Sequence, residues 1–221
     1  MLLDADFGLG NIDILLGIDP PKDIYDLLYK GIPIAEVLIE YEGISIIPAS
    51  SGVQNLTDIT TEQEERLQNA LSELNDQMDL LMIDTAAGIS DNVISLLLSS
   101  DDIILVVSTE PTSIVDAYAV IKVMGELDAS KRFWVVANMV DNADEGSELF
   151  RKLANAAQRF LNKQIHYLAH IRRDRKIVEA VRSQQPVVRL FPQAAVSRDF
   201  SRLALSIIEK MALKKGKKIE K

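Results

Sequence analysis

The chain has 221 residues, of which 48% are apolar and 26% charged, and it contains no cysteine. This composition is typical of a globular domain and excludes the disordered, collagenous and disulfide-rich classes. Without cysteine, the chain can hold neither a thiolate-bound iron–sulfur cluster nor a cysteine-type zinc site. The formal net charge is −9, and because residues 214–221 contribute five lysines against one glutamate, the rest of the chain is more acidic still. We therefore expect that nucleic acid is not a general partner.

The sequence shows neither a membrane-spanning segment nor a secretory leader. Its longest apolar runs are blocks such as 93–98 and 103–107, which fall well short of the about 18 residues that a span requires. Asp4 and Asp6 stand where a leader would carry basic and then apolar residues. We expect a cytoplasmic protein.

Six short apolar runs, rich in β-branched residues, predict strands. They are Leu2–Leu3, Ile44–Pro48, Leu80–Ile83, Ile103–Val107, Phe133–Ala137 and Ile165–Ile171. Segments with apolar residues at helical spacing separate them. Near-continuous apolar strands that alternate with amphipathic helices indicate an α/β fold, with a mostly parallel sheet covered by helices on both faces.

Three amphipathic helices are the clearest. Their apolar positions are Leu67, Leu71, Leu74 and Met78; Leu149, Leu153, Ala156 and Phe160; and Phe200, Leu203, Ile207 and Met211. Thr61 and Glu64 have the spacing of a capping box at the start of the first helix. We expect residues 1–213 to form one domain, with Trp134 in its core, followed by a Lys-rich tail at 214–221.

Polar residues follow five of the predicted strands, at the end where open parallel sheets bind their ligands. These strand ends carry Asp4–Asp6, Asp84–Thr85, Ser108–Glu110, Asn138 and Arg172–Asp174. The sequence therefore predicts one crevice that all five segments line.

The run Leu-Leu-Met-Ile-Asp at 80–84 is an apolar strand that ends in a carboxylate. This is the form of a Walker B element, in which the Asp holds Mg²⁺ directly or through water. Gly88 follows, and a glycine there lets a backbone N–H approach a phosphate oxygen. The alternative is that Asp84 only caps the next helix.

Asp4 and Asp6 form a second candidate element. Residues i and i+2 of a strand point to the same face, so both carboxylates can address one cation. In a phosphoryl-transfer site, one would serve the hydrated Mg²⁺ while the other orients the attacking water. The alternative is that both are turn or N-cap residues before Gly8–Asn11.

Three segments stand in the order and spacing of one protein family. They are LDADFGLGNID at 3–13, LMIDTAAG at 81–88 and TEPTSIVDAY at 109–118. Over essentially its whole length the chain resembles the MinD/ParA ATPases, and within them the MinD-like regulators of flagellar number. The resemblance implies a P-loop NTPase-like fold, ATP/ADP and Mg²⁺ as cofactors, and slow ATP hydrolysis coupled to dimerisation.

The resemblance also implies roles for single residues near the phosphates. Asp4 and Asp84 would support Mg²⁺, and Asp6 would position the hydrolytic water. Asn11 would lie in the first switch, near the phosphates and the dimer partner, and Gly88 would belong to the second switch.

Further roles concern the P-loop lysine and the base. Asp116 matches the family acid that holds this lysine, although it could also complete a capping box with Ser113. Asn138 matches the residue that reads adenine. The loop that wraps the base matches Arg172, Arg173 and Asp174, and Arg172 stands where the family often has proline.

The chain departs from the family in one respect: no segment reads Gly-x-x-x-x-Gly-Lys-[Ser/Thr] or the family's lysine-rich variant. Met1 falls where the family's second strand begins, so we expect an N-terminally truncated form that lacks a strand, loop and helix of about 30 residues. Such a form should be less stable than the longer one, because strand edges are exposed. The alternative is a relative without a P-loop that acts as a scaffold and neither binds nor hydrolyses ATP.

The resemblance implies an ATP-dependent homodimer that sets the number or placement of flagella through a flagellar GTPase, a transcription activator or basal-body proteins. A ParA-type partition ATPase is the alternative, which the acidic charge disfavours. The Lys-rich tail has only Ile219 as an apolar anchor. The tail is either a solvated chain end or makes a weak electrostatic contact with the inner face of the cell membrane.

Overall fold

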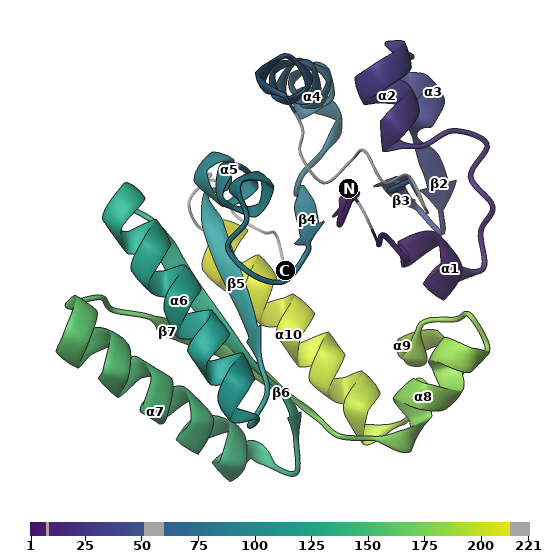
Figure 1. The fold of residues 1–221 in the computed structure, drawn as a ribbon. Helices are drawn as coiled ribbons and strands as arrows, with labels where there is room; N and C mark the ends of the chain where they lie inside the picture. Colours follow the sequence, from purple (N-terminus) through teal and green to yellow (C-terminus); the bar gives the residue numbers. More distant parts are fainter. Residues whose placement is uncertain (8, 51–59, 213–221) are drawn as a thin grey trace. The chain divides into compact units, whose positions relative to one another are not determined.

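The computed structural model describes residues 1–7, 9–50 and 60–212, with side chains to residue 210. Contacts divide the chain into two compact units, Met1–Leu96 and Leu97–Lys221. Each unit has its own β-sheet and its own covering helices (Figure 1). The Lys-rich tail at 214–221 lies outside the described residues.

The first unit contains a four-stranded sheet in the order β2-β3-β1-β4. Its strands are β1 (Leu2–Ala5), β2 (Ile39–Tyr41), β3 (Ile44–Ile47) and β4 (Met82–Thr85). Strands β3, β1 and β4 are parallel, as expected, whereas β2 is an antiparallel edge strand that the sequence did not predict. Glu42 and Gly43 join β2 to β3 with φ of 51° and 83°, the positive angles of a tight hairpin turn.

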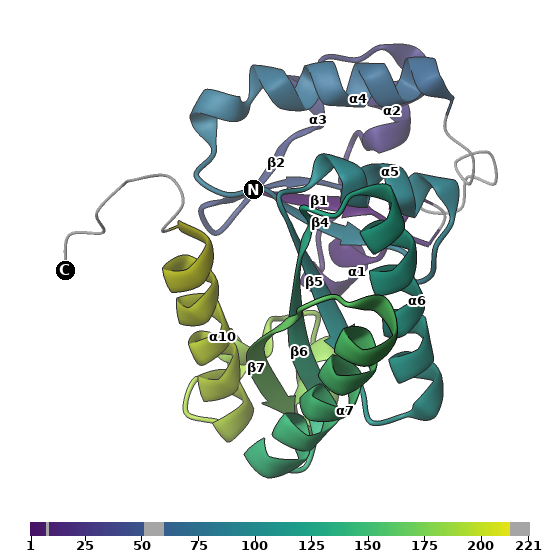
Figure 2. The same cartoon turned by 90° about the vertical axis from the view of Figure 1, so that its left-hand side faces the viewer.

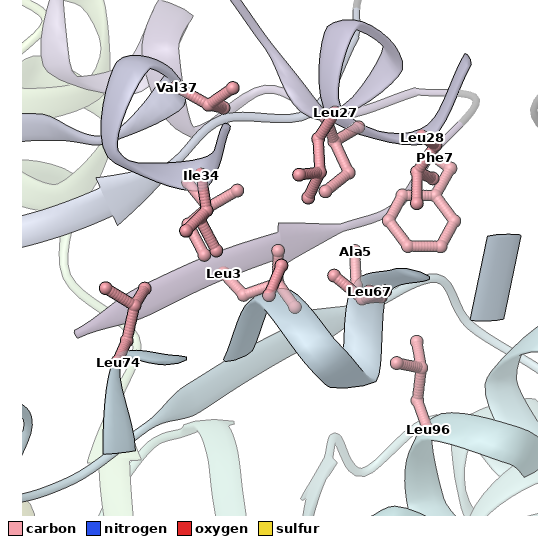
Figure 3. Packing of buried hydrophobic residues seen from close by; sticks show 13 residues of the cluster. Leu3, Ala5, Phe7, Leu27, Leu28, Ile34, Val37, Leu67, Leu74 and Leu96 are labelled. Carbon is pink, nitrogen blue, oxygen red and sulfur yellow. The ribbon is translucent and has the colours of Figure 1, made fainter. Parts of the chain in front are cut away.

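Five α-helices of the described chain begin in the first unit. They are α1 (Ile12–Leu16), α2 (Ile24–Lys30), α3 (Ile34–Val37), α4 (Thr61–Glu73), which a short 3₁₀ turn at Asn75–Gln77 follows, and α5 (Asp91–Ser99). Figure 3 shows the side chains of Leu3 and Ala5 beside those of α2, α3 and α4. Burying this apolar face of β1 leaves the side chain of Asp4 on the opposite face, because successive residues of a strand alternate.

Helix α4 begins one residue earlier than the sequence suggested. Its N-cap is Thr60, whose side chain accepts a hydrogen bond from Gln63 N, while Gln63 Oε1 accepts one from Thr60 N at 2.8 Å. The capping box predicted at Thr61 and Glu64 is therefore wrong by one position. The helix also ends before Met78, which has an extended backbone.

The second unit contains a parallel sheet in the order β5-β6-β7, formed by β5 (Asp102–Val107), β6 (Arg132–Val140) and β7 (His166–Arg172). Its helices are α6 (Pro111–Leu127), α7 (Ala143–Leu161), α8 (Arg175–Arg182), α9 (Val187–Leu190) and α10 (Ala195–Ala212). Figure 2 shows α6 and α7 on one face of this sheet and α10 on the other. The predicted α/β fold with a mostly parallel sheet is confirmed.

Among the residues whose side chains are described, the apolar positions of α7 follow the prediction with one exception, and Met211 of α10 lies outside them. Leu149 and Leu153 are buried in α7, but Phe160 is 67% exposed and Ala157 takes the inward position. Trp134 is buried, as expected, and its Nε1 donates to Asp102 Oδ1 at 2.9 Å. None of the described helices is long and apolar enough to cross a membrane.

Candidate nucleotide site

The register of two parallel strands brings the first pair of candidate carboxylates together. Asp4 of β1 lies directly beside Asp84 of β4, so both side chains emerge on the same face of the sheet. Asp6 follows just after β1, close enough for its charge to act on Asp84. We call Asp4, Asp6 and Asp84 the acidic edge of the first unit.

Asp4 organises the loop that follows it. The side chain is only 2% exposed. Its Oδ1 accepts a hydrogen bond from Asp6 N at 3.2 Å, and its Oδ2 accepts hydrogen bonds from Asn11 N at 3.0 Å and Ile12 N at 3.1 Å. Asp4 is therefore not the N-cap of α1, which is Asn11, but its carboxylate accepts hydrogen bonds from the first backbone N–H groups of that helix.

Gly10 makes this close approach possible. A Cβ at this position would lie 2.1 Å from Ala49 Cβ and 2.9 Å from Asp4 Oδ2. Neither neighbour is the far end of a flexible side chain, so the space admits glycine alone. The loop therefore depends on a residue without a side chain as much as on the carboxylate.

Asp6 closes a turn. Its Oδ1 accepts a hydrogen bond from Leu9 N at 3.1 Å, and its carbonyl oxygen accepts a second one from the same N–H at 3.2 Å. The turn interpretation of Asp6 is confirmed, and it leaves further lone pairs of the carboxylate available for a ligand.

Asp84 stands apart because its carboxylate accepts no hydrogen bond within the described part of the chain. Helix α5 begins only at Asp91, and its first backbone hydrogen bond runs from Ile94 N to the carbonyl oxygen of Ser90. The alternative that Asp84 only caps the next helix is therefore wrong. An exposed carboxylate at a strand end, without a protein partner, is a group that can serve a ligand.

The electrostatics of the acidic edge favour a cation. Burial raises the pKa of Asp4, outweighing its three backbone hydrogen bonds, and the charge of Asp84 raises it further. Desolvation and then the charge of Asp6 raise the pKa of Asp84. Neighbouring carboxylates with raised pKa values are stabilised in the ionised form by a bound cation.

The acidic edge fits Mg²⁺ better than a metal held by protein groups alone. Among the described residues, no group of three or more His, Cys, Asp or Glu side chains could hold a metal ion by itself. Mg²⁺ commonly binds one or two carboxylates and completes its shell with water and phosphate oxygens. Asp84, with its unbonded carboxylate, is the stronger candidate ligand of the pair.

Asn11 and Gly88 flank the acidic edge in the sequence. Asn11 is the exposed N-cap of α1, and its N–H donates to Asp4. Gly88 has φ of 104° and open space where a Cβ would be. This positive φ is readily adopted only by glycine and leaves the backbone N–H approachable.

In the second unit, Asn138 and the loop after β7 lie at the same edge of the sheet. Asn138 pairs with Ile171, and Val140 pairs with Arg172, so the ladder between β6 and β7 shifts at Met139. Met139 has φ of 55°, which is an uncommon angle for a residue other than glycine. Bulges of this kind redirect strand ends and are frequent beside functional sites.

Arg172 is held by Asp199, a residue of α10 that the sequence analysis missed. The guanidinium Nε lies 2.6 Å from Asp199 Oδ2 and Nη2 lies 2.9 Å from Oδ1. The signal in the sequence was an acidic residue on the apolar stripe of a helix, between Val196 and Leu203. Arg172 was expected to contact the base, but here its guanidinium is engaged with this carboxylate.

Arg173 and Asp174 complete the loop. The Arg173 N–H donates to Val140 O at 2.8 Å, and its side chain is exposed. Asp174 is the N-cap of α8 and accepts a hydrogen bond from Lys176 N at 3.0 Å. The backbone of the loop is thus tied to β6 and α8, whereas the Arg173 guanidinium faces solvent.

Asp116 does not form the capping box that was weighed for it. Helix α6 begins at Pro111, and its N-cap is Glu110. The Ser113 hydroxyl instead accepts a hydrogen bond from Ser108 N at 3.0 Å. Asp116 lies on the exposed surface of the helix, and no cap accounts for it.

Comparison with known proteins identifies the family. A model of the AAA domain family matches residues 2–133. The chain is 39% identical over 208 residues to the antiactivator FleN of Pseudomonas aeruginosa, covering 94% of this chain and 74% of that protein. It belongs to the MinD/ParA family.

Two further relatives agree with this assignment. The flagellum site-determining protein YlxH of Helicobacter pylori is 28% identical over 214 residues, covering 95% of this chain and 71% of that protein. The septum site-determining protein MinD of Pyrococcus horikoshii, solved with Mg-ADP, superimposes with a TM-score of 0.77 at 19% identity, covering 96% of this chain and 84% of that one. The second likeness shows the fold, and the first places the chain beside a flagellar protein of the same family.

Proposed function

We propose that this protein is a MinD-type switch that binds Mg-ATP and regulates the number or placement of flagella. The observation that carries the proposal is the 39% identity to the antiactivator FleN across 94% of the chain. The similarity to a flagellum site-determining protein over 95% of the chain supports the same process.

Each unit, taken by itself, supplies residues suited to one part of the cofactor. Asp84 and Asp4 would hold Mg²⁺ at the acidic edge, with Asp6 orienting a water molecule. Asn138 and Arg173 would contact the base, because a planar guanidinium stacks on aromatic rings and an amide can both donate and accept. When bound, Mg²⁺ would neutralise phosphate charge.

The 221 residues do not account for binding of the β- and γ-phosphates. No segment of the 221 residues has the glycine-rich spacing with lysine that cradles β- and γ-phosphates. We therefore derive no hydrolytic step from these residues. The proposal is limited to binding, and the alternative is a scaffold that binds no nucleotide.

Calorimetry of Mg-ATP binding tests the proposal directly. We expect wild-type protein to bind Mg-ATP, and Asp84→Asn to bind more weakly and to lose the dependence on Mg²⁺. Asp76→Asn is the matched control, because it removes one charge from an exposed residue elsewhere in the same unit. Absence of binding both by this chain and by a form extended upstream would contradict the switch and favour the scaffold.

The cellular role needs a separate experiment. A flagellated host that lacks its own homologue should recover its normal number of flagella when this protein is expressed, and Asp84→Asn should fail to restore it. An unchanged number with wild-type protein would contradict the flagellar role. Salt-dependent binding to non-specific DNA, measured by fluorescence anisotropy, would instead favour a partition ATPase.

A further inference from the structure

We propose that Asp199 is a positioning residue for the base loop, residues 172–174, and that it acts through Arg172. The inference rests on the proposed function, since it assumes that this loop contacts a nucleotide base. It assigns Arg172 to support of the loop and leaves Arg173 as the arginine that contacts the base.

The contact between the two residues fixes both side chain and backbone. Asp199 is 1% exposed and lies near the start of α10. Besides the two guanidinium contacts at 2.6 and 2.9 Å, its Oδ2 accepts a hydrogen bond from the backbone N–H of Arg172 at 3.3 Å. A forked pair of hydrogen bonds sets the orientation of the guanidinium, and the third bond fixes the chain at the point where β7 ends.

The next two residues are anchored in different directions. Arg173 is bonded through its N–H to Val140 of β6, and Asp174 through its side chain to the first turn of α8. Three successive residues are therefore tied to α10, β6 and α8. Of these three, only Arg173 has an exposed side chain, so the ties present its guanidinium to solvent beside the bulge at Met139.

The Asp199–Arg172 ion pair is not needed to attach α10 to the sheet. Helix α10 packs on β7 through apolar side chains such as Val196 and Ile207, and this packing needs no ion pair. Replacing a buried ion pair by apolar groups is often neutral or stabilising. What the pair adds is one defined conformation of the loop, which base recognition requires.

The main test uses Asp199→Asn and Arg172→Lys. Asparagine keeps the size but loses the charge and one acceptor, and lysine keeps the charge but cannot form the fork. Asp102→Asn is the matched control, because Asp102 pairs with Arg132 at the opposite end of the same sheet. Arg202→Gln is a second control, since Arg202 approaches Asp199 from solvent at 3.5 Å.

Two measurements separate positioning from simple support of the fold. Amide hydrogen exchange without nucleotide should become about tenfold faster at residues 172–176 in Asp199→Asn, with β5 unchanged. The preference for ATP over GTP, from competition against a fluorescent ATP analogue, should fall by about tenfold. Arg172→Lys should lie between wild type and Asp199→Asn, and both controls should match wild type in this preference.

The outcomes distinguish failure of the positioning role from failure of the proposed function. Faster exchange throughout the second unit, or a loosened loop with an unchanged preference for ATP, would overturn the positioning role while the switch survives. If neither this chain nor a form extended upstream binds nucleotide, the proposed function and the positioning role are overturned together, whatever the exchange shows. Local loosening with a lost base preference supports both.

Discussion

The acidic edge of the first unit and the Asp199–Arg172 pair of the second balance negative charge in opposite ways. In the acidic edge, no cationic side chain of the described residues acts on Asp4 or Asp84, and the pKa values of both are raised. Burial also raises the pKa of Asp199, but the hydrogen bonds and charge of Arg172 outweigh it and the net direction is downward. The pKa values of the first cluster are thus raised by burial and mutual repulsion, whereas the carboxylate of Asp199 is stabilised in its charged form by Arg172.

The largest loss of stability is expected from Gly10→Ala, which introduces a steric clash into the loop that Asp4 holds. The added methyl group would overlap Ala49 Cβ at 2.1 Å, and such overpacking costs about 1–3 kcal/mol or more. Pulsed hydrogen exchange on peptides of β1 and β4 during urea unfolding would measure the loss. Gly125→Ala is the control, because its Cβ meets only the flexible Lys163 side chain; equal losses for both variants would contradict the argument.

Asp199→Ala should destabilise the second unit by about 2 kcal/mol, because Arg172 is left without its partner. Arg172 is partly exposed, which keeps the loss below that of a fully buried pair. Trp134 is the single tryptophan of the chain, so its fluorescence in urea reports the second unit. A midpoint equal to wild type would show that the pair adds no stability to the second unit.

Asp4→Asn and Asp84→Asn should change stability in opposite directions. The first places an NH₂ group among backbone N–H donors and should cost about 1–2 kcal/mol. The second removes an unpaired charge and, in the absence of divalent ions, should stabilise by less than about 1 kcal/mol because water screens an exposed carboxylate. Urea unfolding of the first unit in EDTA measures both, and a loss for Asp84→Asn would contradict a repulsive acidic edge.

The smallest effect is the pH dependence, which should differ between the units. A raised carboxylate pKa stabilises the fold below about pH 4, and this contribution is lost as the pH rises through the raised values. The first unit should therefore weaken above pH 4 in EDTA and recover part of its stability in millimolar Mg²⁺. Asp199 contributes above about pH 4, and its contribution is lost as the pH falls through its lowered pKa. The same urea measurements at several pH values test both signs.

Much of the fold could be predicted because it follows from local pattern. The apolar runs predicted the parallel strands of both sheets, and the helical spacing predicted α4, α7 and α10. Strand β2 was missed because Glu40 and Tyr41 carry no apolar run, and its pairing with β3 depends on the turn at Glu42 and Gly43. The cap of α4 was placed one residue late because Thr60 and Thr61 both have a suitable partner three residues on.

The candidate site was predictable only as a set of residues. Polar side chains at strand ends identified Asp4, Asp84, Asn138 and the base loop, since parallel strands place these ends at one edge of a sheet. Asp199 was not found, because its partner Arg172 is 27 residues away and the contact forms only when α10 packs on β7. For the same reason, Arg172 was assigned to the base rather than to Asp199.

The sequence by itself determined the fold class, the family and the residues that end each strand, because hydrophobic period and motif spacing are local properties of the chain. The tertiary structure alone decided which charges are balanced. The register of β1 against β4 places Asp84 beside Asp4, where burial and the neighbouring charge of Asp6 raise the pKa of Asp84. The packing of α10 on β7 brings Asp199 into an ion pair with Arg172. Electrostatic balance depends on distances between segments far apart in the chain, and only folding sets those distances.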